Sequence, residues 1–152
     1  MRPTLPRRAL FGLFSAAAIG WSTAALAAPV TFTVPLSGKQ NVPMVSGYGS
    51  GSAKLTWDAQ TRHLSWSVAY SGLSSPVTMA HFHGPAKAGQ NAGVLVWITH
   101  RGAASNPSPI TGAATLTPAQ TKQFEAGLWY INVHTKKHPA GEIRGQVMPP
   151  KG

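Results

Sequence analysis

Four of the chain's six histidines lie in two short segments of the sequence, His81 and His83 in one, His134 and His138 in the other. Successive side chains on a β-strand point to opposite faces, so His81 and His83 would project from one face while Phe82 faces the core. Imidazole nitrogens that converge from three side chains are typical ligands of copper and zinc. The spacing therefore predicts a metal site formed by His81, His83 and His134, with His138 as a fourth ligand reached through a turn.

The same alternation over residues 128–134 places the second group of histidines. It directs Trp129, Ile131 and Val133 to the core and His134 outward. The metal ligands are therefore expected to be surface histidines on the outer face of a sheet.

Other side chains are expected beside these histidines. Met79 has the same parity as His81 and His83, and its thioether favours copper, especially Cu(I), over zinc. Tyr130 and Asn132 are expected on the histidine face, where they would line a shallow groove.

Glu142 and Arg144 allow several interpretations. They would share one face of a strand and form a surface ion pair. Alternatively, the Glu142 carboxylate would accept the second N–H of a ligand histidine, and Arg144 would attract small anions to the site. A purely structural interpretation is also open, in which the histidines hydrogen-bond to the backbone and to Glu142 or Arg144 and fix a loop over residues 84–92.

The composition of the chain narrows the enzyme classes that fit. The sequence has 13 lysines and arginines, three acidic residues and no cysteine, so the carboxylate pair of most glycosidases and a cysteine nucleophile are not favoured. Gly-x-Ser-x-Gly is absent as well, and the balance is against an enzyme. Beyond residues 1–27, ten lysines and arginines stand against three acids, a net charge of +7. This charge would attract an anionic polymer or partner protein, but no dense basic run predicts specific nucleic-acid binding.

Residues 1–27 have the pattern of an export signal. Three arginines precede an uncharged apolar stretch over residues 9–24, and Ala25 and Ala27 provide the small residues of a cleavage site. We expect export by the general or the twin-arginine route, and a mature domain over residues 28–152 that is periplasmic or secreted and keeps no membrane span. Without cysteines, this domain would be stabilised by packing alone.

The remaining sequence is almost wholly of β type. Alternating or continuous apolar patterns predict strands at about residues 30–34, 53–57, 64–70, 77–83, 94–99, 128–134 and 142–148. Pro35 is expected to end the first strand, and four tryptophans are expected in the core, Trp57, Trp66, Trp97 and Trp129. Short strands separated by turns predict an all-β fold, an antiparallel β-sandwich.

One short helix is expected over residues 118–126. Thr117 is a good N-cap, Pro118 suits the first helical position, and Gln120 completes a capping box. Gly127 then provides the left-handed residue that commonly follows a helix.

Several segments closely resemble the CHRD domain, a module named after chordin that also occurs alone in exported bacterial proteins. The matching segments are Ala80-His81-Phe82-His83-Gly84-Pro85-Ala86, Gly93-Val94-Leu95-Val96, Leu116-Thr117 with the helix that follows, Gly127-Leu128-Trp129-Tyr130-Ile131-Asn132-Val133-His134 and His138-Pro139-Ala140-Gly141-Glu142-Ile143-Arg144-Gly145-Gln146. The resemblance spans roughly residues 31–148 and implies an immunoglobulin-like sandwich located outside the cytoplasm. It implies no defined reaction, and we expect the domain to act chiefly as a binding module.

A weaker similarity is to copper-zinc superoxide dismutase, a β-sandwich in which a His-x-His pair and a histidine on a late strand hold copper. His81 and His83 match the pair, and His134 matches the later histidine, but the chain lacks the zinc loop and the disulfide of those enzymes. Three functions stay open. They are an exported module that binds copper, or less favourably zinc; an interaction or structural domain without metal that binds a partner protein or an anionic matrix; and a superoxide-dismutase-like redox enzyme.

Overall fold

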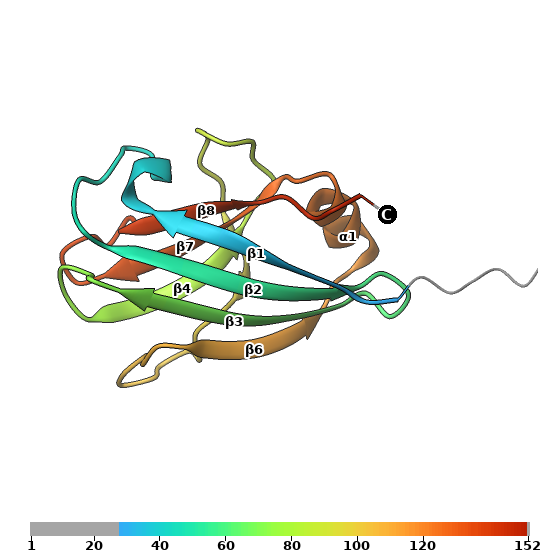
Figure 1. Ribbon diagram of the computed structural model, residues 1–152, viewed down its shortest axis with the longest axis horizontal. Helices are drawn as coiled ribbons and strands as arrows, with labels where there is room; N and C mark the ends of the chain where they lie inside the picture. Colours follow the sequence, from blue (N-terminus) through green and yellow to red (C-terminus); the bar gives the residue numbers. More distant parts are fainter. Residues whose placement is uncertain (1–27, 152) are drawn as a thin grey trace, which may run out of the picture.

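The computed structural model describes residues 28–151, which form eight β-strands, one α-helix and one 3₁₀ turn (Figure 1). In chain order the elements are β1 (Val30–Ser37), η1 (Gly38–Gln40), β2 (Ser50–Asp58), β3 (His63–Ser71), β4 (Val77–His83), β5 (Val94–Trp97), β6 (Ile110–Thr115), α1 (Pro118–Glu125), β7 (Trp129–Thr135) and β8 (Ile143–Val147). The predicted all-β fold with one short helix is confirmed. The predicted export signal, residues 1–27, lies outside the described residues.

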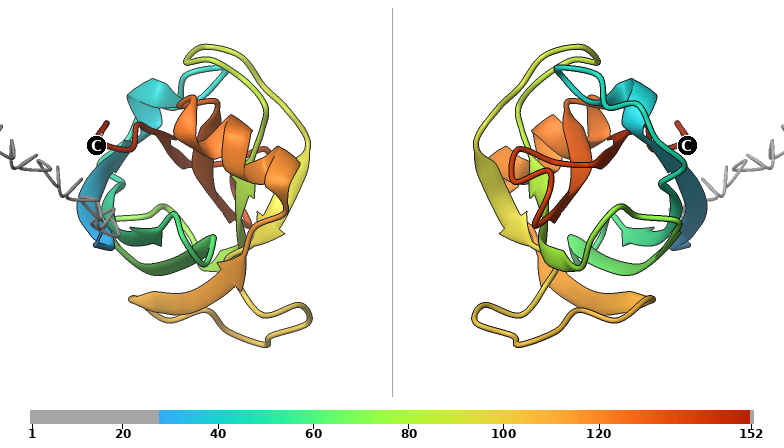
Figure 2. Two further views of the ribbon diagram at one scale, coloured as in Figure 1. Left: turned by 90° about the vertical axis from the view of Figure 1, so that its right-hand side faces the viewer. Right: turned by 90° about the vertical axis from the view of Figure 1, so that its left-hand side faces the viewer.

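The strands form one antiparallel sheet in the order β5-β4-β7-β8-β1-β2-β3-β6. It consists of two four-stranded halves, and they meet where β1 pairs with β8 at a single position, Ser37 opposite Arg144. The sheet is rolled so that the halves face each other, and it is nearly closed when seen end-on (Figure 2). The two layers of the antiparallel sandwich therefore belong to one sheet, joined where β1 pairs with β8.

The core lies between the two halves of the sheet. Inward residues of β4 and β7 are fully buried, among them Phe82, Trp129, Ile131 and Val133 at 0 % exposure. The Trp66 ring on β3 meets the Phe82 ring on β4 edge to face, with centroids 5.3 Å apart. The predicted alternation of these strands is thus confirmed, and it leaves the histidine positions on the outer face of the sheet.

The helix α1 lies across one end of the rolled sheet (Figure 2). Both hydrogen bonds of the predicted capping box form, from Gln120 N–H to the Thr117 hydroxyl and from Thr117 N–H to the Gln120 side chain. Phe124 is fully buried and packs on Trp57 and Trp129 with ring centroids 5.0 and 5.6 Å away. The capped helix thereby closes that end of the core.

Two strand predictions differ from the structure. β1 continues past Pro35 to Ser37. Since β8 pairs with β1 only at Ser37, the rest of that side of β1 is an edge of the sheet. Proline, which has no backbone N–H, is tolerated at such an edge. β6 was missed because its inward residues include glycine. A Cβ at Gly112 would lie 2.7 Å from the Trp66 ring, so the bulky neighbour leaves no room for the apolar side chain that marks a strand.

Candidate metal centre

The three predicted ligands His81, His83 and His134 come from neighbouring strands of one half of the sheet. In the pairing of β4 with β7, His81 lies opposite Asn132 and His83 opposite Tyr130, while Met79 lies opposite His134. Directly paired residues of an antiparallel sheet share a face. All six side chains therefore lie on the outer face, as the alternation predicts.

The three imidazoles converge. One ring nitrogen from each of His81, His83 and His134 lies within 4.8 Å of the others, and the ring centroids are 5.1 to 5.7 Å apart. Around an ion with metal–nitrogen distances of about 2.0–2.1 Å, donor atoms stand about 3.3–4.1 Å apart. The three nitrogens therefore lie close to the spacing that a shared ion requires.

The histidines are on the outer face but not at the surface. His81, His83 and His134 are only 2 %, 8 % and 6 % exposed, so the prediction of surface histidines is wrong. Residues 84–93, between β4 and β5, pack against this face: the Tyr130 hydroxyl accepts from Ala92 N–H at 2.9 Å. Strand alternation reveals which face a side chain takes, but not that a loop folds over that face.

Two backbone carbonyls fix the protonation of two of the rings. The Nδ1–H of His83 donates to Ala92 O at 3.0 Å, and the Nδ1–H of His134 donates to Pro139 O at 2.9 Å. A carbonyl can only accept, so in both rings Nε2 carries the lone pair. Metal-binding histidines usually donate their second ring N–H in this way.

The remaining ring nitrogens complete the arrangement. His81 Nδ1 lies 3.2 Å from His134 Nε2, and because that Nε2 is unprotonated, His81 donates to it. The Nε2 atoms of His81 and His83 are buried without a hydrogen-bond partner. Since buried polar atoms are generally paired, two unpartnered lone pairs beside a third imidazole are a place where a cation fits.

The environment keeps the three rings neutral. Burial lowers the pKa of His81 to about 4, and the charges of His134, His83 and Arg101 act in the same direction. Burial also lowers the pKa of His83 and of His134, against the hydrogen bonds to Ala92 and Pro139. Protons therefore do not compete with a metal for these nitrogens at neutral pH.

Arg144 is a buried cation that binds the loop of residues 84–93, which lies over the histidine face. It is 1 % exposed, and its guanidinium donates to Gln90 O at 2.8 Å and to Asn91 Oδ1 at 3.1 Å. The predicted surface ion pair with Glu142 does not form. Arg144 instead holds the loop directly, whereas the structural interpretation expects the histidines to hold it; of those, His83 does so through Ala92 O.

Glu142 and His138 lie outside the group of converging rings. The Glu142 carboxylate accepts from Ser74 N–H at 2.7 Å and from the Thr135 hydroxyl at 2.6 Å, not from a histidine. Burial raises the pKa of Glu142, but the hydrogen bonds from Thr135 and Ser74 outweigh it and lower the pKa. His138 donates its backbone N–H to the Thr135 hydroxyl and its ring is not part of the three-histidine group.

Asn132 supports the turn that carries Pro139. Its Nδ2 donates to Ala140 O at 3.3 Å, and a Cβ at Gly141 would lie 2.2 Å from its Oδ1. Gly141 has φ +118, a conformation that favours glycine. The turn can therefore approach the histidine face closely enough for Pro139 to accept from His134.

Two residues of the site were missed from the sequence. Trp97 was expected in the core, but it pairs with His81 across β4 and β5 and lies edge-on to the His81 ring, with centroids 4.3 Å apart. Arg101 places its guanidinium 4.6 Å from the centre of the Trp97 ring. The continuous apolar run of β5 hides its facing, and the register shift between Phe82 and His83 cannot be read from the sequence.

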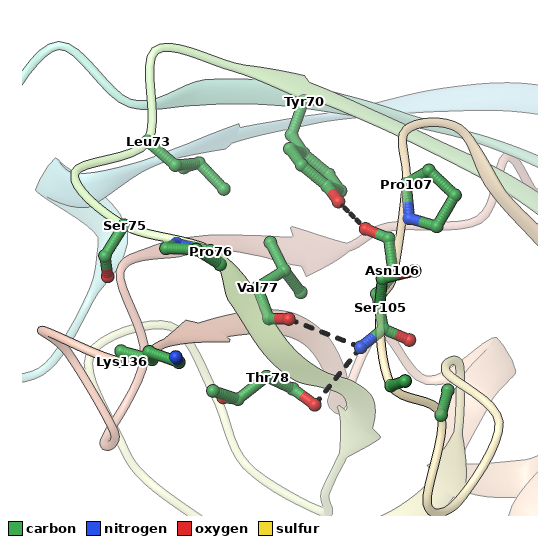
Figure 3. Close-up of a pocket in the computed structure, with 12 residues that line it drawn as sticks. Tyr70, Leu73, Ser75, Pro76, Val77, Thr78, Ser105, Asn106, Pro107 and Lys136 are labelled. Atoms are coloured by element: carbon green, nitrogen blue, oxygen red, sulfur yellow. Dashed lines mark hydrogen bonds between the residues drawn. The ribbon is translucent and has the colours of Figure 1, made fainter.

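A cavity of about 590 Å³ is lined by residues of β3, of β4 and of the loop before β6 (Figure 3). Its wall is mostly apolar, with Tyr70, Leu73 and Val77, and Lys136 provides a cation. The loop that precedes β6 lines one side, where Asn106 donates to the carbonyls of Val77 and Thr78 and accepts from the Tyr70 hydroxyl. None of the histidines lines this cavity.

A family model for the CHRD domain matches residues 32–147, which include both strands of the histidine cluster. No curated protein and no solved structure matches the chain significantly. Within residues 28–151, no helix is both long and apolar enough to cross a membrane.

Proposed function

The chain belongs to the CHRD domain family, and we propose that it is an exported binding module that holds a copper ion with His81, His83 and His134. The observation that carries the proposal is the convergence of three ring nitrogens within 4.8 Å on one buried face. The carbonyls of Ala92 and Pro139 support it, because they leave Nε2 of His83 and of His134 unprotonated and able to act as a ligand atom.

The donor set favours copper over zinc. Closed structural zinc sites take four ligands and commonly include thiolates, whereas the described residues bring together three histidines and no cysteine or carboxylate. Met79 stands opposite His134 on the same face, and a thioether favours copper. His138 is not needed as a ligand in this proposal.

Export is part of the same proposal. The pattern of residues 1–27 supports cleavage after Ala27 and release into the periplasm or the medium. CHRD domains occur in extracellular proteins, which agrees with that location. A copper site built from imidazoles without cysteine also suits an oxidising compartment.

The test is a metal titration of the mature protein with Cu(I), Cu(II) and Zn(II) by competition with a chromophoric chelator. His83→Ala should weaken copper binding at least about tenfold, since it removes one of three ligands. His100→Ala is the matched control, because His100 is exposed and outside the group. Equal, weak binding by the wild type and His83→Ala would refute the metal site.

A second candidate is binding of an anionic matrix or partner protein without metal. It is favoured by the net charge of +7 that residues 28–152 carry, with ten lysines and arginines against three acids, and by the cation Lys136 in the lining of the apolar cavity. Retention on a heparin column that persists well above moderate salt would support a defined site, because interactions between exposed charges are then screened. Lys136→Gln should reduce that retention, and Lys137→Gln, which does not line the cavity, serves as its control.

A superoxide-consuming enzyme is supported least. Such chemistry needs an open coordination position and a path for the substrate. His81, His83 and His134 are at most 8 % exposed beneath the loop of residues 84–93, which favours a closed site. If the copper-loaded protein consumes superoxide faster than free copper does, the enzymatic function would be favoured over the other two.

A further inference from the structure

We infer that the histidine site favours Cu(I) over Cu(II), because a fixed positive charge stands behind an aromatic ring on each flank of an uncharged ligand set. The inference rests on the proposed copper site and adds the oxidation state of the ion. It follows from two stacks of side chains, one on each side of the converging rings.

The first stack runs from His83 through Tyr130 to Arg144. The His83 and Tyr130 rings are stacked at 7° with centroids 4.9 Å apart, and the Arg144 guanidinium lies 3.6 Å from the centre of the Tyr130 ring. Because β7 lies between β4 and β8, His83 approaches Tyr130 from one side and Arg144 from the other. The Arg144 charge is therefore held in the interior, one ring away from a ligand.

The second stack runs from His81 through Trp97 to Arg101. The His81 and Trp97 rings meet at 89° with centroids 4.3 Å apart, and the Arg101 guanidinium lies 4.6 Å from the Trp97 centre. The two stacks together place a cation behind both members of the His-x-His pair.

The ligand group itself carries no negative charge. The group of converging ligands contains no carboxylate among the described residues. The three acids of the chain lie elsewhere. Glu142 is held by Ser74 and Thr135, Asp58 accepts from backbone N–H groups of its own turn, and Glu125 is exposed at the end of α1.

Electrostatics then separates the two copper ions. The cost of moving an ion out of water grows with the square of its charge, and the repulsion from Arg101 and Arg144 is proportional to that charge. Both terms disfavour Cu(II) more than Cu(I). Three neutral nitrogens provide the low coordination number that suits Cu(I) better than Cu(II), and Met79, opposite His134 on the same face, carries a thioether of the soft type that selects Cu(I).

The experiment measures the affinities for the two ions separately in the mature protein. Cu(I) is titrated without oxygen against bathocuproine disulfonate, and Cu(II) is titrated in air against a fluorescent peptide chelator. The wild type should bind Cu(I) at least about tenfold more tightly than Cu(II). Arg101→Glu should lower that ratio by about threefold or more, a modest change because Arg101 is exposed and its field is partly screened.

The control variant is Lys54→Glu, which makes the same change of charge at an exposed position on β2, in the other half of the sheet. Lys54→Glu should change the ratio of Cu(I) to Cu(II) affinity by less than about twofold from that of the wild type. Arg101→Gln provides a second variant with half the change in charge, and unfolding curves confirm that each variant folds.

The outcomes distinguish the inference from the proposed function. If copper binds but Cu(II) binds as tightly as Cu(I), the inference is overturned and the metal site stands. The same holds if Arg101→Glu and Lys54→Glu change the ratio equally. If neither ion binds to the wild type, the proposed function itself fails.

Discussion

Lowering the pH from 7 to 4.5 should destabilise the metal-free protein, because His81, His83 and His134 are buried as neutral rings. Burial lowers the pKa of all three histidines in the folded state, while in the unfolded chain each has a pKa near 6.5. Between these values the unfolded state binds more protons than the folded state. The free energy of unfolding therefore rises with pH across this window and is fully present only above about pH 7.

The size of the effect follows from the pKa of His81. A folded pKa of about 4 lies about 2.5 units below the unfolded value, which corresponds to at most about 3.5 kcal/mol at about 1.4 kcal/mol per unit. His83 and His134 add to this loss with the same sign. Glu142 acts in a different window, since its lowered pKa contributes stability that is lost only as the pH falls below the value near 4.5 of an unfolded carboxyl group.

Urea unfolding of chelator-treated protein at pH 7, 6, 5 and 4.5 measures this dependence. We expect the free energy of unfolding to decrease by at least about 2 kcal/mol over the series. His81→Gln should flatten the slope, whereas His100→Gln should retain it. A wild-type free energy of unfolding that stays constant from pH 7 to pH 4.5 would show that the folded state does not hold these histidines as neutral rings with lowered pKa values.

Two further predictions concern local structure. Thr117→Ala should lower the free energy of unfolding, measured by chemical denaturation, by about 1 kcal/mol, because it removes the hydroxyl that caps α1. Thr115→Ala is the control, since it measures the effect of the same substitution at an exposed threonine that caps no helix. Gly141→Ala should cost about 2–4 kcal/mol, because φ is +118 and the new Cβ meets Asn132. Gly93→Ala has open space, so equal melting temperatures for the two glycine variants would contradict this account.

Local sequence patterns predicted the parts of the fold that depend on local rules. The capping box of α1 formed because the side chains of Thr117 and Gln120 and the backbone they cap lie within four residues of chain. The facing of His81, His83 and His134 followed from strand alternation. The strand β6 was missed because the small residue Gly112 is required by Trp66, a contact between strands that are distant in sequence.

The candidate site shows the same division between local and distant contacts. The ligands were predicted, but their burial was not, because it depends on residues 84–93 folding back over the face. Glu142 was assigned to the site from its place in sequence, although its partners Ser74 and Thr135 lie elsewhere. Trp97 was assigned to the core because an apolar run does not reveal which face of the sheet each residue takes.

Strands and loops contribute differently to the chemistry of the site. β4 and β7 set the positions of the three rings, but the carbonyls that decide which nitrogen is free belong to Ala92 and Pro139, in the connections after β4 and after β7. The sheet alone would leave each imidazole free to change tautomer and to bind a proton. Affinity for a metal therefore depends on loops packed against an outer sheet face, and the same loops exclude the water that would otherwise stabilise a doubly charged ion.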